Sequence, residues 1–170
     1  MTPAATFPPF QEGTWRDRLG GIVIQSRIAK ATARRGYERQ YFPAIEVGLS
    51  GWERAHSQGS GTGHESPSGI RYAPAEVNQK FQRLGIERFI RELLEIKAPD
   101  VELRLQTVTY SHPGTLRLRE IQYRVDAVRN GLWRELFEAS IEVENRKDHP
   151  RVVPNVEMLV PREVWETYLT

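Results

Sequence analysis

The 170-residue chain contains no cysteine, which excludes disulfide bonds, thiolate nucleophiles and cysteine-ligated zinc. It has no apolar run near the roughly 20 residues of a membrane-spanning helix, so we expect no membrane span. No basic segment followed by an apolar one begins the chain, so we expect synthesis in the cytoplasm without a classical signal peptide. Lysine is also scarce. Most of the 24 basic residues are arginines, whose planar guanidinium groups match phosphate and carboxylate.

The composition of the chain changes near residue 36. Residues 1–36 are rich in proline, glycine and basic side chains, and we interpret them as a tail or linker to an upstream segment. A loose helix or a docking arm around the apolar triplet at residues 22–24 is the alternative. Residues 37–170 are long enough to bury one core, so we expect a single domain there.

Residues 37–170 predict an α+β fold in which an antiparallel meander of three long strands, plus one or two short strands, packs against helices on one face. The predicted long strands are Val101–Ser111, Thr115–Arg129 and Leu132–Glu144, and the predicted short ones are Tyr41–Leu49 and Asn155–Val160. A helix is predicted over Pro74–Lys97, divided in two at Gly85, and a terminal helix begins at Pro161.

The turns and phases of the long strands are readable from the sequence. Asn130-Gly131 between two β-rich runs is a strong hairpin signal, because both residues accept positive φ. A phase shift of the apolar positions predicts a bulge near Arg119 in the second strand. The two-residue period predicts that Trp133 and Phe137 share the buried face of the third strand.

The segment Ser50–Pro74 is the candidate site, because a long aperiodic loop inside a compact domain is usually functional or disordered. Histidine transfers protons near neutral pH, arginine stabilises developing negative charge, and glycine lets backbone N–H groups face an anion. The candidate catalytic residues are Arg54, His56, His64, Glu65 and Ser66; the candidate substrate-binding residues are Gly61, Gly63, Arg71, Asn78 and His112. A surface loop whose polar groups bond only to one another is the alternative.

Other site classes fit less well. The glycine run lacks the Gly-Lys-Ser/Thr ending of a phosphate-binding loop, and no βαβ unit surrounds it. The four histidines follow no common zinc spacing, so we expect neither a metal nor another cofactor.

The segment from Gly51 to Leu93 resembles the C-terminal toxin domains of bacterial polymorphic toxin systems, most closely polymorphic toxin type 4. The resembling features are Arg54-x-His56, the Gly-x-Gly loop, Glu65-Ser66, Ala73-Pro74, Val77-Asn78-Gln79 and Gly85-Ile86-Glu87. The resemblance implies an upstream delivery domain, export, action in the cytoplasm of a target cell, and a cognate immunity protein. Many small toxin domains of this class are nucleases, which makes nucleic acid, and RNA in particular, the expected substrate.

Three hypotheses follow. The first is a metal-independent ribonuclease, in which His56 acts as acid or base with His64 or Glu65, and Arg54, Ser66 or the glycine-loop amides stabilise the transition state. The second is transfer of ADP-ribose from NAD, for which Glu142-x-Glu144 is the nearest acidic pair. The third is a non-catalytic module whose loop binds a partner protein.

Overall fold

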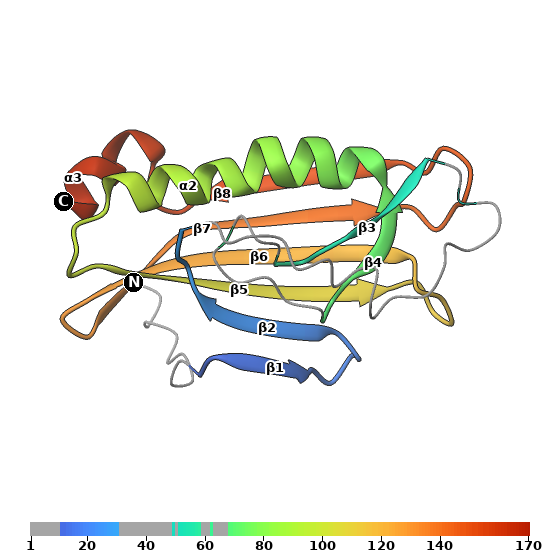
Figure 1. The fold of residues 1–170 in the computed structure, drawn as a ribbon, viewed down its shortest axis with the longest axis horizontal. Coiled ribbons are helices and arrows are strands. Elements are labelled where there is room, and N and C mark those ends of the chain that lie inside the picture. The colour runs from blue at the N-terminus through green and yellow to red at the C-terminus, as the bar shows by residue number, and fades with distance from the viewer. Residues whose placement is uncertain (1–10, 31–48, 50, 59–61, 63–67) are drawn as a thin grey trace.

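The structure is a computed structural model that describes residues 11–30, 49, 51–58, 62 and 68–170, the side chains of Leu84 and Tyr168 excepted. Within these residues, six antiparallel strands form one sheet in the order β1-β2-β5-β6-β7-β8, and two further strands form a small ribbon. Helices cover one face of the sheet (Figure 1). The predicted α+β class is therefore confirmed.

The strands of the large sheet are β1 (Gly13–Arg16), β2 (Ile22–Arg27), β5 (Glu102–Ser111), β6 (Leu118–Arg129), β7 (Leu132–Val143) and β8 (Val152–Met158). The three predicted long strands correspond to β5, β6 and β7 and are confirmed. The turn between β6 and β7 has Asn130 at φ 51° and Gly131 at φ 73°, as the Asn-Gly signal predicts. The predicted strand Tyr41–Leu49 lies outside the described residues except for its last residue.

One bulge was predictable and a second was not. The pairing of β5 with β6 shifts between Tyr110 and Ser111, opposite Arg119, which confirms the predicted bulge. A further shift between Val125 and Asp126, in the pairing with β7, changes the phase of β7. Phe137 is therefore fully buried, but Trp133 is half-buried beneath a guanidinium group, so the prediction that both share the buried face is wrong.

The N-terminal strands belong to the sheet, in contrast to the predicted tail or linker. β2 pairs with β5 over six residues, from Ile22 opposite Thr109 to Arg27 opposite Arg104, and β1 pairs with β2. Ile24 is only 1% exposed. The apolar triplet of β2 is thus buried in the sheet, and residues 13–27 are neither a loose helix nor a separate arm.

The predicted long helix is η2 (Val77–Ile86) followed directly by α2 (Glu87–Ile96). Near Gly85 the hydrogen bonding tightens from a π-helical to an α-helical pattern, but the ribbon does not break (Figure 1). The predicted terminal helix is present as η3 (Arg162–Val164) and α3 (Trp165–Leu169). Among the described residues, no helix has the length and apolar character to cross a membrane.

Aromatic side chains hold the helices on the sheet. The ring of Phe89 from α2 packs edge-on against Phe137 of β7 with centroids 5.9 Å apart, and Phe137 stacks on Trp165 of α3 at 6.1 Å. Ile90 and Leu93 are fully buried beneath α2. The core therefore lies between this helical layer and the inner face of β5, β6 and β7.

The segment that the sequence presents as one long loop has paired ends. β3 (Trp52–Ala55) and β4 (Arg71–Pro74) form an antiparallel ribbon. The amide of Tyr72 donates to the carbonyl oxygen of Leu116 at 2.9 Å, which fixes β4 to the turn between β5 and β6. This contact brings Arg71 to one end of the large sheet.

Candidate functional site

A cavity of about 880 Å³ opens at the end of the sheet where β5 finishes. Its walls come from the β1–β2 turn, the start of β4 and the β5–β6 turn. The lining residues are Arg16, Leu19, Gly20, Arg71, Tyr72, Tyr110, Ser111, His112, Pro113, Gly114, Thr115, Leu116 and Arg119. Three of these lining residues are arginines, and no described lining residue carries a carboxylate, so we call it the basic cavity.

Arg71 is the most firmly held of these arginines. Its Nε donates to Ser111 Oγ at 2.5 Å, and its Nη1 donates to the Ile70 carbonyl oxygen at 2.6 Å. Burial lowers the pKa of Arg71, and the positive charge of Arg16 lowers it further. Two guanidinium groups are thus close enough to repel each other, which is an arrangement that a bound anion stabilises.

Tyr110 fixes a second wall of the basic cavity. Its hydroxyl donates to Asp17 Oδ2 at 2.7 Å, and the Asp17 carboxylate also accepts from the amide of Gly21. This bond raises the pKa of Tyr110 to about 12 and lowers the pKa of Asp17. The Arg119 guanidinium lies over the Tyr110 ring, 5.0 Å from its centroid. The hydrogen bond between Tyr110 and Asp17 therefore anchors the β1–β2 turn, and with it Arg16, beside Arg119.

His112 lines the basic cavity and is only 5% exposed, unlike a typical solvated turn histidine. Its Nε2 is 2.9 Å from the carbonyl oxygen of Val143. Because a carbonyl only accepts, Nε2 carries the proton and Nδ1 keeps the lone pair in the neutral ring. Burial lowers the pKa of His112, and the charges of Arg117 and Arg119 act in the same direction. The imidazole is therefore neutral at pH 7 and suited to accept a proton.

Of the predicted site residues, Arg71 and His112 come together in the basic cavity. His64, Glu65, Ser66, Gly61 and Gly63 lie outside the described residues. Arg54 and His56 are half-buried on and just after β3, and neither lines the basic cavity.

Asn78 has a role other than lining that cavity. Its Nδ2 donates to Glu53 Oε2 at 3.0 Å, and Gln79 Nε2 donates to the other oxygen of the same carboxylate at 2.5 Å. These bonds tie the first turn of η2 to β3. In the structure, Asn78 therefore connects these two elements.

The described part of the glycine-rich segment packs onto the inner face of the sheet. Gln58 is fully buried, accepts from Ser26 Oγ at 2.6 Å and donates to Thr107 Oγ1 at 3.2 Å. The His56 carbonyl oxygen accepts from Gln82 Nε2 at 2.7 Å. Gly69 has φ +76°, and a side chain there would meet Ser57 Oγ at 2.6 Å. The hydrogen bonds hold the start of the segment against β2, β5 and η2, and Gly69 packs closely against Ser57.

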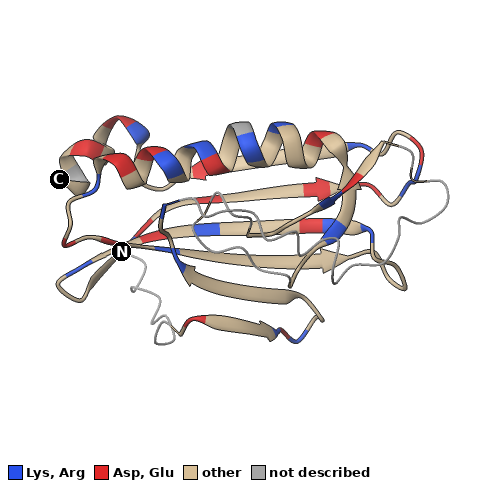
Figure 2. Cartoon of the chain, viewed as in Figure 1, with Lys and Arg blue, Asp and Glu red and all other residues tan. Residues whose placement is uncertain are grey.

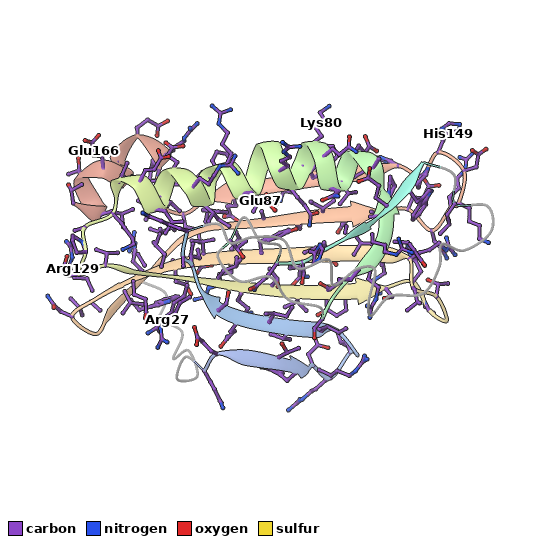
Figure 3. All side chains as sticks on the ribbon, in the orientation of Figure 1. Arg27, Lys80, Glu87, Arg129, His149 and Glu166 are labelled. Atoms are coloured by element: carbon purple, nitrogen blue, oxygen red, sulfur yellow. The ribbon has the colours of Figure 1, made fainter. Side chains whose placement is uncertain are left out.

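The remaining charged groups follow other patterns. Arg124 pairs with Asp126 at 3.0 Å, and Arg129 with Asp100 at 3.1 Å, so both make ordinary ion pairs. Charges of both signs are interspersed along η2 and α2 (Figure 2). His149 lies on the β7–β8 loop and points away from the sheet (Figure 3). No set of three or more candidate metal ligands occurs within the part of the chain that the structure describes.

A second cavity of about 700 Å³ adjoins the first, because His112 and Arg119 line both. Its other lining residues are Glu120, Glu142, Val143, Glu144, Asn145, Arg151 and Val153. It contains three carboxylates and two guanidinium groups, and we call it the mixed-charge cavity.

Sequence reasoning missed Arg16, Arg119, Tyr110 and Ser111 as partners in one site. The available signal was Tyr110-Ser111-His112 directly before the Pro-Gly turn, since polar side chains at the end of a strand share an edge of the sheet. The approach of Arg16 had no local signal, because it depends on the pairing of β1 with β2.

The family model described as Bacterial toxin 4 matches residues 49–152, more than half of the chain. No curated protein and no solved structure matches.

Proposed function

Because the chain belongs to the Bacterial toxin 4 family, we propose that it is the effector domain of an exported toxin and that it cleaves RNA without a metal ion. One observation carries the proposal: three arginines line a cavity that a buried, neutral histidine also lines. Arginine binds phosphate through a planar, bidentate fork, and a neutral imidazole is an effective proton acceptor near pH 7.

In this proposal the basic cavity binds a phosphodiester. Arg71 is pre-positioned by Ser111 and by a backbone carbonyl, so little side-chain entropy is lost when a phosphate binds. Arg16 and Arg119 approach from the other walls. The mutual repulsion of Arg71 and Arg16 falls as negative charge accumulates on the phosphorane-like transition state, which is the effect that accelerates the reaction.

His112 acts as the general base. Its Nδ1 accepts the proton of the ribose 2′-hydroxyl, whose oxygen attacks phosphorus while the bond to the 5′-oxygen breaks. The products are a 2′,3′-cyclic phosphate and a 5′-hydroxyl, and the leaving 5′-oxygen takes a proton from a general acid. His64 and Glu65, which lie outside the described residues, stay the predicted candidates for that acid, and Ser66 and the glycine-loop amides stay predicted to assist. Arg54 and His56 do not line the basic cavity and take no part in this step.

The proposal also concerns partners and location. A cytoplasmic RNA target requires delivery into the recipient cell, for which an upstream delivery domain is proposed. A producing cell that makes an active ribonuclease needs a neutralising immunity protein, and the three arginines of the basic cavity favour an acidic contact surface on it.

The test is incubation of the purified chain with total RNA and tRNA in the presence of EDTA. We expect cleavage by the wild type and, for Arg16→Gln and Arg71→Gln, a loss of rate of roughly a hundredfold, because one transition-state donor is removed in each. Arg83→Gln is the matched control, since Arg83 is exposed on η2 away from the cavity.

Thermal unfolding of each variant distinguishes a loss of catalysis from a loss of folding. Because Arg16 is exposed, we expect Arg16→Gln to keep the core intact. RNA that stays intact with the wild type contradicts the proposal. A mass shift of a target that requires NAD supports ADP-ribosyl transfer in its place. A chain that is harmless when expressed in the bacterial cytoplasm supports a binding module.

A further inference from the structure

We infer that the mixed-charge cavity is the base-recognition subsite of the proposed ribonuclease, that it selects guanine, and that Glu142 is the specificity-determining residue. The inference rests on the proposed function for the identity of the ligand as an RNA nucleotide. Its own support is the arrangement of donors and acceptors around the second cavity.

The two cavities adjoin each other at shared residues. His112, which is nine-tenths buried, and Arg119 line both of them. A nucleotide whose phosphate lies among the arginines of the basic cavity therefore has its nucleoside beside the mixed-charge cavity. The two ends of the ligand meet different chemistry, since three guanidinium groups and no carboxylate line the basic cavity, whereas three carboxylates line the mixed-charge cavity.

Within the mixed-charge cavity, the carboxylates differ in what they already bind. Glu120 Oε1 accepts from Gln122 Nε2 at 3.1 Å. Glu144 Oε2 accepts from the Arg151 amide at 3.0 Å. The Glu142 side chain is exposed and makes no hydrogen bond or ion pair with the residues that the structure describes. Its two oxygens are thus the acceptors that a ligand can use.

The placement of Glu142 also carries an electrostatic cost that a ligand can offset. Glu142 on β7 lies directly opposite Glu120 on β6 in the sheet register. Like charges in directly opposed positions destabilise a sheet. Two N–H donors bound to Glu142 reduce this repulsion, whereas a bound phosphate increases it.

Guanine is the base that fits these acceptors. Its Watson–Crick edge has two adjacent donors, N1–H and the N2 amino group, which match the two oxygens of one carboxylate. Adenine and cytosine present one amino group beside a ring-nitrogen acceptor, and uracil presents one N–H between two carbonyl oxygens. Each of these places an acceptor lone pair against a carboxylate oxygen.

The test measures binding of 3′-GMP, 3′-AMP, 3′-CMP and 3′-UMP by calorimetry. We expect the wild type to bind 3′-GMP roughly tenfold more tightly than the other three, as one bidentate pair permits. Glu142→Gln should lose that preference and keep its affinity for the other nucleotides. Glu157→Gln is the matched control, because Glu157 is exposed on β8 and lines neither of the two cavities.

The outcomes separate the inference from the proposed function. Arg71→Gln should weaken the binding of all four nucleotides by a similar factor, since this substitution removes a contact with the phosphate alone. Equal binding of the four nucleotides, no binding of any, or a guanine preference that survives in Glu142→Gln overturns the inference. RNA cleavage that shows no base preference keeps the proposed function and overturns the subsite. Guanine-selective binding without cleavage keeps the subsite and overturns the ribonuclease.

Discussion

His112 departs from an ordinary turn histidine because its ring is buried and bonded to the Val143 carbonyl oxygen. Burial lowers its pKa below the usual 6.5, so the neutral, basic form persists as the pH falls to slightly acid values. We expect kcat/KM for RNA cleavage to rise with pH and then to level off, with the midpoint of the rise below pH 6.5. His112→Asn should lower the plateau by roughly 10² to 10⁴ and remove this limb of the profile. An unchanged limb in that variant would exclude His112 as the base.

Glu135 gives a prediction about stability. Its carboxyl lies beside Arg124 on the sheet; burial, followed by a hydrogen bond with Glu138, raises its pKa to about 7. In the unfolded chain the pKa returns to about 4.5. Between these values the folded state binds more protons than the unfolded state, so the free energy of unfolding decreases as the pH rises.

The variant Glu135→Gln keeps a polar side chain of similar size but does not ionise. We expect the melting temperature of the wild type to fall more than that of Glu135→Gln between pH 5 and pH 8. Thermal unfolding followed by circular dichroism measures this difference. Two melting curves that shift in parallel would show that the Glu135 pKa is not raised.

At the residue scale, part of the site could be predicted from the sequence. Arg71 and His112 could be predicted as candidates, because each lies beside a turn and has a side chain that can bind phosphate or transfer a proton. Their meeting with Arg16 was not predictable, because it depends on how the β1–β2 turn docks against Tyr110 through Asp17. A contact between residues that far apart in the chain leaves no local pattern in either segment.

At the scale of elements, the β1–β2 hairpin is the feature that the sequence obscures. β2 contains a single short apolar triplet within a basic segment, so its composition favours a linker. In the sheet, the same triplet is buried against β5. The β6–β7 hairpin was predictable because Asn130-Gly131 specifies its turn locally. The bulge beside Asp126 could not be predicted, because it depends on the register in which β6 pairs with β7.

A substitution in β2 tests whether that strand is part of the folded core. Ile24→Ala removes a side chain that is 1% exposed, so we expect a loss of about 2–5 kcal/mol in the free energy of unfolding. Leu19→Ala, at a site that is 80% exposed in the neighbouring turn, should change it by less than about 0.5 kcal/mol. Denaturant unfolding measures both. Equal stability of the two variants would indicate that residues 13–27 are a linker and not part of the folded sheet.

At the scale of the whole molecule, the charge is nearly balanced, with a formal net charge of +2 at pH 7. Binding of RNA must therefore come from a local cluster, and the basic cavity supplies three guanidinium groups. Neutralising three phosphates of a single strand predicts a slope of roughly −2 for log affinity against log salt concentration. Fluorescence anisotropy with a labelled oligoribonucleotide measures this slope. A slope of roughly −5 or steeper would indicate a much larger basic surface.

The most direct measurement for the whole account is the chemistry of the RNA ends after incubation with the purified chain in EDTA. We expect fragments that end in a 2′,3′-cyclic phosphate and begin with a 5′-hydroxyl, formed by the wild type and by Arg83→Gln but hardly by Arg71→Gln. Intact RNA, or fragments that begin with a 5′-phosphate, would contradict it.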